Sequence, residues 1–383
     1  MTRYRAAHLF TGHGWHSPGE VVVEGDRIVS VGPPSEDTIT EDTAPEDTTT
    51  EVIDLGEVTL APGLVDVHNH GGGGVAFADD PGPAIELHRQ AGTTSIVASL
   101  VSQSIDTLEA QVHRLRPLVE SDELAGIHLE GPWLSERYKG AHPAEQLRDP
   151  VDVDVDRLLD AGAGTVRMVT LAVERAGAPE TVRRLAARDV VVALGHSDCT
   201  FEQAREAIDA GVTGATHLFN AMPGLHHRTP GPILALLADE RVWCELIVDG
   251  VHVHVDLVAW VLGLHDRVVL ITDAMAAAGC ADGHYRLGDL PVEVADGVAR
   301  IAGTDTIAGS TLTLAAAVRT AILAGVRPEV ALRSATLNPA RYLRLIDVGT
   351  LEEGSWADFV TFDADWRIGT VVRRGRRVEP LSV

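Results

Sequence analysis

The sequence of 383 residues contains little cysteine, little lysine and few aromatic side chains. Its three cysteines, Cys199, Cys244 and Cys280, are an odd number at wide spacing, which argues against a disulfide framework and against a cysteine-based zinc site. No apolar run approaches the roughly eighteen residues that a membrane helix needs, and none near the N-terminus is long enough for a signal peptide. We therefore predict a cytoplasmic protein.

Positive charge is also scarce. The chain has 31 lysine and arginine residues against 56 acidic residues, which gives a formal net charge of −25. Nucleic acids and anionic membranes select for basic faces, so neither is expected as the main partner. A small anionic substrate stays possible, because one or two local cations are enough to hold it. Lys139 is the single lysine of the chain.

What the chain does have is apolar material, since hydrophobic residues make up 45% and can form a sizeable core. Residues 3–32 predict short strands joined by glycine turns. They are followed by SEDTITEDTAPEDTTTE at 35–51, which carries seven acids and almost no apolar residues. Such a segment has little to bury, so we predict a disordered, solvated loop.

From residue 59 onward, apolar β-rich runs alternate with helix-like stretches, a pattern typical of βα units around a parallel sheet. Eight candidate strands can be counted, from LAPGLVDVH at 60–68 to RVVLITDA at 267–274. This number favours a (β/α)8 TIM barrel over an open Rossmann sheet. Short strands return after about residue 346. We predict one part of a small β-sandwich domain at 1–58, the barrel at 59–345, and the other part of the β-sandwich at 346–383.

Ionisable side chains follow six of the candidate strands at their C-terminal ends, where TIM-barrel chemistry takes place. They are His68, His70, Glu130, His196, His217, His252 and Asp273. Such groups are costly after buried runs unless they meet a ligand or a partner, so their repetition indicates one shared site. Imidazole and carboxylate together suit zinc or another divalent first-row metal. We interpret most other histidines as surface residues, among them His13, His16, His88, His113, His265 and His284.

Eight segments form a set of motifs: PGLVDVHNHG (62–71), GIHLEGPW (126–133), KGAHP (139–143), GHSDCT (195–200), THLFNAMPGLHHRTPG (216–231), DGVHVH (249–254), LITDAM (270–275) and IAGS (307–310). With these motifs the chain resembles the amidohydrolase superfamily and, within it, the N-acetylglucosamine-6-phosphate deacetylase family, nearly end to end. The resemblance implies that the protein removes acetyl from N-acetyl-D-glucosamine 6-phosphate, giving D-glucosamine 6-phosphate and acetate.

The resemblance also implies a metal site. Glu130, His196 and His217 match the ligands of a tightly held metal, while His68 and His70 match a second site that only some members possess. We expect one or two divalent ions per subunit, zinc first, with iron, manganese or cobalt as alternatives, and Glu130 as a possible bridging ligand. Many relatives bridge two metals with a carboxylated lysine, but the single lysine of this chain lies in a loop.

Catalytic and substrate-binding roles follow from the same matches. Asp273 matches the general base that accepts a proton from a metal-activated water and then, as general acid, protonates the departing amine. His142 would polarise the acetyl carbonyl. Arg228 and His252 match the phosphate-binding residues, with Arg228 reaching into the neighbouring active site of a homodimer. Further substrate-binding matches are Ala141, Asn220, Ala221, Ile307, Ala308 and Gly309.

Three alternative functions stay open. N-acetylgalactosamine 6-phosphate differs from the implied substrate at one sugar hydroxyl, and the sequence does not separate the two. A cyclic-amide hydrolase or a nucleobase deaminase fits less well, since these relatives generally use a bridging lysine or a single-metal histidine set. A non-catalytic scaffold is disfavoured because such proteins lose ligands, whereas every expected ligand is present here.

Overall fold

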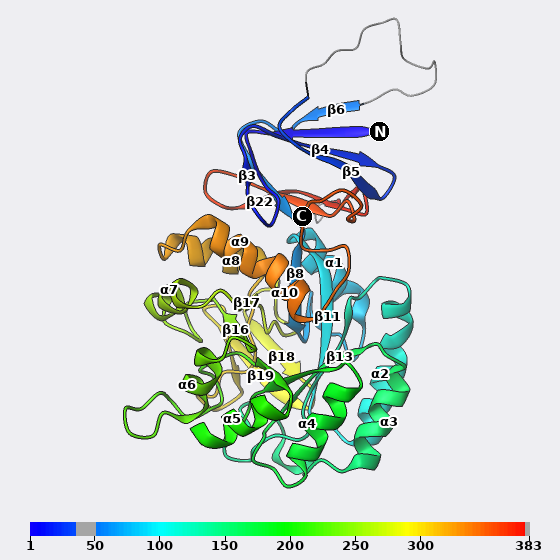
Figure 1. Ribbon diagram of the computed structural model, residues 1–383. Helices are drawn as coiled ribbons and strands as arrows, with labels where there is room; N and C mark the ends of the chain where they lie inside the picture. The colour runs from blue at the N-terminus through cyan, green and yellow to red at the C-terminus, as the bar shows by residue number, and fades with distance from the viewer. Residues whose placement is uncertain (36–50, 380–383) are drawn as a thin grey trace, which may run out of the picture.

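A parallel sheet of eight strands, curled into a nearly closed barrel, forms the centre of the protein in a computed structural model that describes residues 1–35 and 51–379 (Figure 1). The strands are β8 (Leu64–Asn69), β11 (Thr93–Val101), β12 (Gly126–Glu130), β13 (Val166–Leu171), β14 (Val191–Leu194), β15 (Val212–Ala215), β16 (Trp243–Ile247) and β17 (Val268–Ile271). They lie in this order around the barrel. The predicted TIM-barrel architecture is confirmed.

The barrel closes where its first and last strands meet. The backbone N–H of Asp273 donates to the carbonyl oxygen of His68 at 2.9 Å. The Thr272 hydroxyl donates to the buried carboxylate of Asp66 at 2.6 Å. These bonds hold the C-terminal ends of β8 and β17 side by side.

Strand composition follows from burial on both faces of the barrel sheet. β11 reads TTSIVASLV, and only its last residue, Val101, is not fully buried. Parallel strands that are covered on both faces are typically apolar and β-branched in this way. Their side chains and those of the surrounding helices form one continuous core. The strand ends are therefore fixed by dense packing on all sides.

The α-helices of the described residues are α1 (Pro81–Gln90), α2 (Ile105–Glu120), α3 (Asp152–Gly162), α4 (Ala178–Ala187), α5 (Phe201–Ala210), α6 (Gly231–Ala238), α7 (Val255–Leu264), α8 (Leu314–Leu323), α9 (Pro328–Ala335) and α10 (Leu337–Tyr342), with a 3-10 turn at Ala144–Gln146. Thr200 and Gln203 form a capping box that starts α5. The loop after α1 contains Gly92, at φ +97°, where a Cβ would lie 2.7 Å from Ile368 Cδ1. None of these helices is long and apolar enough to cross a membrane.

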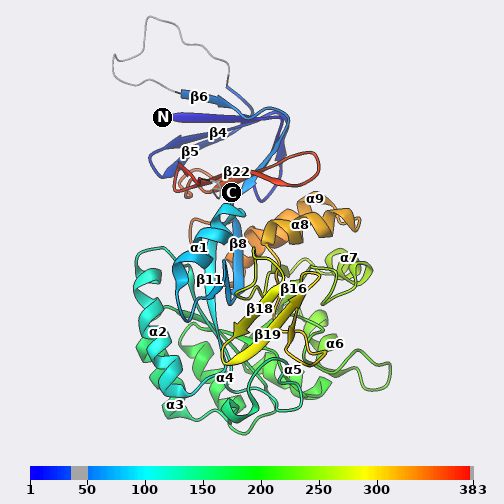
Figure 2. The same cartoon turned by 180° about the vertical axis from the view of Figure 1, so that it is seen from behind.

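Both chain ends contribute to two small sheets at one end of the molecule (Figures 1 and 2). One sheet contains β1 (Thr2–Ala6), β4 (Gly19–Glu24), β5 (Arg27–Gly32) and β6 (Glu51–Asp54). The other contains β2 (His8–Phe10), β3 (Trp15–His16), β7 (Thr59–Pro62), β21 (Phe359–Phe362), β22 (Ile368–Arg373) and β23 (Arg376–Arg377). Tyr4 and Phe359 join the sheets in one core, with ring centroids 4.8 Å apart. The predicted β-sandwich from both chain ends is confirmed, while its boundaries at 58/59 and 345/346 remain predictions.

Most of the predicted acidic loop lies outside the described residues, which omit 36–50. The ends of the 35–51 segment differ from the prediction. The Ser35 hydroxyl donates to Glu20 at 2.9 Å, and Glu51 begins β6. Ser35 therefore contacts the folded sheet, and Glu51 belongs to it.

A further sheet follows β17 and was not predicted. Its antiparallel strands β18 (Gly283–Leu287), β19 (Leu290–Ala295) and β20 (Val298–Ile301) are yellow in Figure 2. A short pair, β9 (Gly71–Gly72) and β10 (Val75–Ala76), follows the first barrel strand. Leu287 of β18 and the loop after β20 line the candidate site described next.

Candidate metal centre and active site

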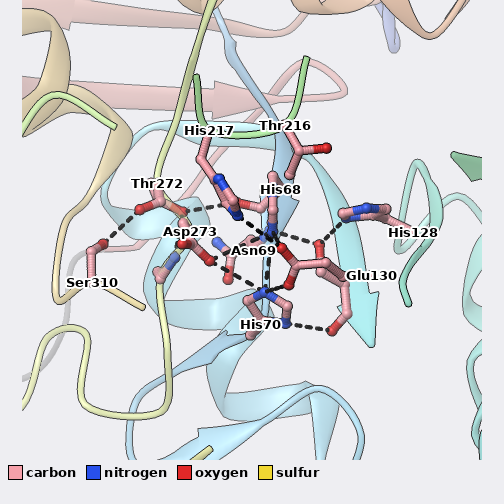
Figure 3. Close-up of polar contacts among 12 residues, drawn as sticks. His68, Asn69, His70, His128, Glu130, Thr216, His217, Thr272, Asp273 and Ser310 are labelled. Carbon is pink, nitrogen blue, oxygen red and sulfur yellow. Dashed lines mark hydrogen bonds and ion pairs between the residues drawn. The ribbon is translucent and has the colours of Figure 1, made fainter. Parts of the chain in front are cut away.

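The C-terminal ends of the barrel strands bring a set of imidazoles and carboxylates together (Figure 3). The set consists of His68, His70, Glu130, His142, His196, His217 and Asp273, and no member is more than 8% exposed. His68 and His70 belong to β8 or follow it directly, Glu130 ends β12, and Asp273 follows β17. Seven ionisable side chains thus share one buried volume.

Glu130 lies at the centre of this cluster. Its Oε1 atom is 3.1 Å from Nε2 of both His196 and His217. Its Oε2 atom is 3.1 Å from Nε2 of His70 and 3.4 Å from Nε2 of His142. Nε2 of His68 lies 3.6 Å from Oε1 as well, so the two oxygens contact five imidazoles between them, and Glu130 is placed to contribute to two metal positions.

Hydrogen bonds on the far side of the imidazoles fix which nitrogen faces the cluster. The Nδ1 atoms of His70 and His196 lie 3.2 and 2.8 Å from backbone carbonyl oxygens, which only accept, so each Nδ1 carries a proton. The Nε2 lone pairs of both rings then point inward. Nε2 of His196 lies 3.0 Å from that of His217, and Nε2 of His70 lies 3.1 Å from that of His68. Facing lone pairs repel unless a cation or proton lies between them, so the arrangement fits divalent metal ions.

Glu245 orients the fourth imidazole and was not predicted from the sequence. Its fully buried Oε2 lies 3.1 Å from Nδ1 of His68, and the same oxygen accepts the backbone N–H of His217 at 3.4 Å. The Tyr342 hydroxyl donates to Oε1 at 3.4 Å. Burial, together with this carboxylate, raises the pKa of Tyr342 well above its usual value, so the phenol stays a donor. Glu245 thus orients His68 through the nitrogen that faces away from the cluster, as carboxylates commonly do for histidines that bind metals.

The cluster strongly favours cations. Burial alone would lower the pKa of His70, but its hydrogen bonds to Asp273 and Glu130 raise it to about 9. Burial would raise the pKa of the Glu130 carboxyl, yet the surrounding imidazoles, His68 first, hold it well below its usual range. Burial would also raise the pKa of Asp273, but His68 and His70 lower it below its usual value. Both carboxylates are therefore ionised at neutral pH.

His142 differs from the other imidazoles in its orientation. The backbone N–H of Ser102 donates to its Nδ1 at 3.3 Å, so Nε2 carries the proton. Burial first, and then the charge of His196, lowers the pKa of His142 to about 4. Although His142 lies close enough to Glu130 and His196 to share a metal with them, it presents a neutral N–H donor rather than a lone pair.

The backbone at the site is held in a conformation that L-residues rarely adopt. His196, His217 and Asp273 have φ values of +47°, +29° and +48°. Such positive values persist only where the surrounding structure enforces them, and they concentrate at functional sites. Gly309, at φ +64°, lets the loop after β20 approach, since a Cβ there would lie 3.0 Å from the carbonyl oxygen of Asp273.

A cavity of about 380 Å³ opens onto the cluster. The predicted site residues that line it are His70, Glu130, Ala141, His142, His196, His217, Asn220, Ala221, His252, Asp273, Ile307 and Gly309. Burial would lower the pKa of His252, but Asp249, 2.7 Å from its Nδ1, raises it. Three predicted residues do not line the cavity: His68 and Ala308 are fully buried, and Arg228 is exposed on the loop before α6.

Comparisons with known proteins identify the family. Residues 59–378 match the amidohydrolase family. The chain is 36% identical to an N-acetylgalactosamine-6-phosphate deacetylase of Escherichia coli O157:H7, over 97% of this chain and 98% of that protein. It is 33% identical to an N-acetylglucosamine-6-phosphate deacetylase of Vibrio furnissii, over 98% and 94%. The chain belongs to the amidohydrolase family.

A solved structure narrows the position within this family. It is of a mutant N-acetyl-D-glucosamine-6-phosphate deacetylase from Mycobacterium smegmatis in complex with N-acetyl-D-glucosamine-6-phosphate. The two chains are 44% identical and superpose with a TM-score of 0.92, over 98% of this chain and 99% of that one. The predicted resemblance to the deacetylase branch of the amidohydrolase family is confirmed.

The interpretation of the remaining histidines as surface residues was wrong for His128, which is fully buried in β12, and for His88. His88 is fully buried, and its Nε2 bonds the carbonyl oxygen of Gly71 at 3.0 Å. It lies on the inner face of α1 together with Ala84 and Ile85, so the helical spacing of apolar residues gave a signal for burial.

Other cavity residues were not predicted, namely Val101, Arg137, Tyr138, Gly140, Leu287, Asp305 and Thr306. Arg137 and Tyr138 lie in the loop after β12, whose sequence has no periodic pattern to place its side chains. The Arg137 side chain is 72% exposed and pairs with Asp198 at 3.0 Å. Glu245 did leave a signal, since it is a charge inside the apolar run of β16.

Proposed function

We propose that this amidohydrolase hydrolyses the acetamide bond of N-acetyl-D-glucosamine 6-phosphate and releases acetate and D-glucosamine 6-phosphate. The observation that carries the proposal is the placement of the Asp273 carboxylate over the imidazole cluster, with Oδ1 3.2 Å from Nε2 of His70. The deacetylases of known specificity that the chain resembles over nearly its whole length support the substrate.

Asp273 moves the proton in the proposed reaction. Its carboxylate is ionised at neutral pH and borders the cavity, so it can accept a proton from the water that attacks the acetyl carbon. It then returns this proton to the sugar nitrogen as the carbon–nitrogen bond breaks, because an amide anion is too basic to leave.

His142 stabilises the charge that develops on the acetyl oxygen. Its Nε2–H reaches the cavity while Ser102 holds the other nitrogen. A neutral imidazole is a suitable donor for this task, since it does not hand its proton to the oxygen prematurely. Losing one oxyanion donor typically costs about 2.7–4 kcal/mol in the activation free energy.

Two metal positions complete the proposal. His196 and His217 with Glu130 would hold one ion, and His68 and His70 with Glu130 would hold a second. Bound divalent ions would supply Lewis acidity that polarises the acetyl carbonyl and lowers the pKa of water. Nitrogen and oxygen donors in this ratio suit zinc first, with iron, manganese or cobalt as alternatives. Lys139 takes no part, since its Nζ donates to the carbonyl oxygen of His142 at 3.4 Å.

The phosphate group would bind His252 and an arginine from a second subunit. His252 lines the cavity, whereas Arg228 of the same chain is exposed and does not. Arg228 therefore suits a homodimer in which it enters the neighbouring active site. The test is to mix Arg228→Ala with Asp273→Asn, since a heterodimer of these two variants contains one site with both residues intact. Activity should recover on mixing, and no recovery would place Arg228 in its own subunit's site or outside both.

The galacto epimer is the second candidate substrate, because the relative from Escherichia coli is an N-acetylgalactosamine-6-phosphate deacetylase. Acetate release from the 6-phosphates of both N-acetyl sugars decides between them. Metal-free protein would be refilled with zinc, iron, manganese or cobalt, with Asp273→Asn prepared in parallel as the control for host enzymes. Preference for the gluco sugar is expected; preference for the galacto sugar reassigns the substrate, and no release from either under any metal overturns the proposal.

A further inference from the structure

A second cavity, of about 330 Å³, is lined by residues of the barrel and of the C-terminal part of the small sheets. Its lining includes Thr94, Ser95 and Ile96 at the start of β11. Val101, at the other end of the same strand, lines the candidate active site. At about 3.3 Å per residue, Ile96 and Val101 are roughly 17 Å apart along the strand. The cavity is therefore separate from the deacetylase site, and we call it the arginine cavity.

The name reflects its lining, in which four guanidinium groups meet three carboxylates. The cations are Arg167, Arg344, Arg373 and Arg374, and the anions are Asp122, Glu123 and Asp347. In a chain with a net charge of −25, such a concentration of arginine is unexpected.

Two of the three carboxylates are already paired with arginines that do not line the cavity. Glu123 accepts from Arg89 at 2.6 Å, and Asp347 accepts from Arg27 at 2.7 Å. Their negative charge is therefore largely compensated by arginines outside the lining, and the net charge of the side chains that line the arginine cavity is positive.

The cavity arginines, in contrast, have weak or no anionic partners. Among residues 1–35 and 51–379, no carboxylate lies within 4 Å of the side-chain nitrogens of Arg167 or Arg373. Arg373 donates instead to the backbone carbonyl oxygens of Thr94 and Asp122. Burial first, and then the nearby charge of Arg89, lowers the pKa of Arg373, while the carboxylates of Asp358 and Glu123 act in the opposite direction.

The two other arginines are also incompletely matched. Arg374 lies 3.8 Å from Asp122, and its Nε–H is buried without a hydrogen-bond partner. Arg344 pairs at 3.1 Å with Asp189, but their side chains are 63% and 92% exposed, so this pair contributes little. Several N–H donors are thus available to a ligand in the arginine cavity.

Trp356 helps to orient these donors. The guanidinium groups of Arg27 and Arg374 lie over its ring, 3.2 and 3.3 Å from the centroid. Stacking of this kind holds Arg374 in a fixed plane before any ligand arrives. Because arginines cover the indole, it is not free to stack on an aromatic ligand, which favours a compact polar anion over a nucleotide.

We propose that the arginine cavity binds a phosphate dianion, either as inorganic phosphate or as the phosphate group of a small sugar phosphate. Planar guanidinium forks match two phosphate oxygens at once. The volume is at the lower end of the range, about 300–1,000 Å³, that is typical of small-molecule sites. The bound anion supplies the direct ion-pair partner that Arg167 and Arg373 lack among the described residues.

Calorimetric titration with inorganic phosphate at constant ionic strength tests this proposal. All proteins carry His252→Ala, which removes the phosphate contact proposed for the deacetylase site. The test variant adds Arg167→Ala and Arg344→Ala. The matched control adds Arg183→Ala and Arg188→Ala, which remove the same charge from exposed positions within α4 and directly after it.

We expect one phosphate per chain in the His252→Ala protein. The test pair should weaken binding at least about tenfold, as the loss of charge-assisted hydrogen bonds implies, and the control pair should leave the dissociation constant within about twofold. No binding to the His252→Ala protein, or equal effects of the two pairs, overturns the proposal. Thermal unfolding of both pairs confirms that they are folded.

The two sources of phosphate are separated by repeating the titration with glucosamine 6-phosphate and with glucosamine. Because glucosamine 6-phosphate is also the product of the deacetylase site, tighter binding than that of inorganic phosphate assigns the arginine cavity to a sugar phosphate when the test pair weakens it and the control pair does not. Equal affinities assign it to the phosphate group alone. Binding of glucosamine that matches its 6-phosphate would contradict recognition of an anion.

Discussion

The two ends of β11 carry polar groups of opposite character. At the C-terminal end, Ser99 and Ser102 hold His70 and His142 in a buried cluster that favours cations. At the N-terminal end, Thr94 accepts from Arg373 at the edge of the arginine cavity. The imidazoles at the first end are held by hydrogen bonds, whereas the arginines at the second end have N–H groups available to a ligand. This difference predicts that substitutions at the first end abolish chemistry, whereas those at the second end change binding.

Asp273→Asn should have the largest effect on catalysis among the variants considered. The amide cannot accept the proton of the attacking water, so we expect kcat to fall by at least about 10³-fold, within the range for general acid–base catalysis. Metal content, measured by elemental analysis, should stay near that of the unchanged protein. Activity within about tenfold of the parent would show that another group moves the proton.

His142→Gln should lower kcat by about 10²–10³-fold with a small change in KM, since the N–H donor acts on charge that develops during the reaction. Ser102→Ala, which removes a hydroxyl partner of Nδ1 but leaves the imidazole, serves as the comparison. Its loss should be smaller. Equal losses in the two variants would argue that His142 acts only through packing.

Glu245→Gln should weaken metal binding by about 10–100-fold, because an amide neither orients His68 nor raises its basicity as a carboxylate does. Competition with a chelator measures this change. The exposed Glu240→Gln provides a matched control on the neighbouring turn and should leave affinity unchanged. A wild-type affinity in Glu245→Gln would remove its role as a positioning residue.

Metal affinity should rise with pH, by up to about tenfold per unit where one proton is displaced. In the metal-free protein the pKa of His70 is about 9 instead of 6.5, so a proton occupies its imidazole at neutral pH. The bound proton stabilises the metal-free fold fully below pH 6.5, and this contribution is lost as the pH rises through about 9. Chelator competition between these values measures the slope, and a flat profile would show that no proton is displaced.

Arg344→Ala, in the arginine cavity, should have the smallest effect among these variants. Its side chain is 63% exposed and pairs with an exposed carboxylate. The free energy of unfolding in phosphate-free buffer should therefore change by no more than about 0.5 kcal/mol. A chemical denaturation series checks this value, and a larger loss would mean that the arginine cavity serves stability.

The barrel was predictable because its strands are covered on both faces, so each ionisable residue at a strand end stood out against apolar neighbours. Glu130 and Asp273 are examples. The β18–β20 sheet had no such contrast, because its strands alternate between buried and exposed residues and carry no run of apolar side chains. Arg137 was missed because a loop side chain is placed by tertiary contacts, and those contacts leave no local pattern in the sequence.

The hydrogen bonds that close the barrel also set the order in which the site can be assembled. The Thr272 hydroxyl contacts the carbonyl oxygen of His68 across 204 positions of sequence. During synthesis the chain therefore presents His68 and His70 long before β17 exists to cover the open edge of β8. Contacts of such separation form late and slowly. Stable capture of metal by both groups of ligands must then follow closure of the barrel, and a chain released before β17 retains an unpaired strand edge that favours aggregation.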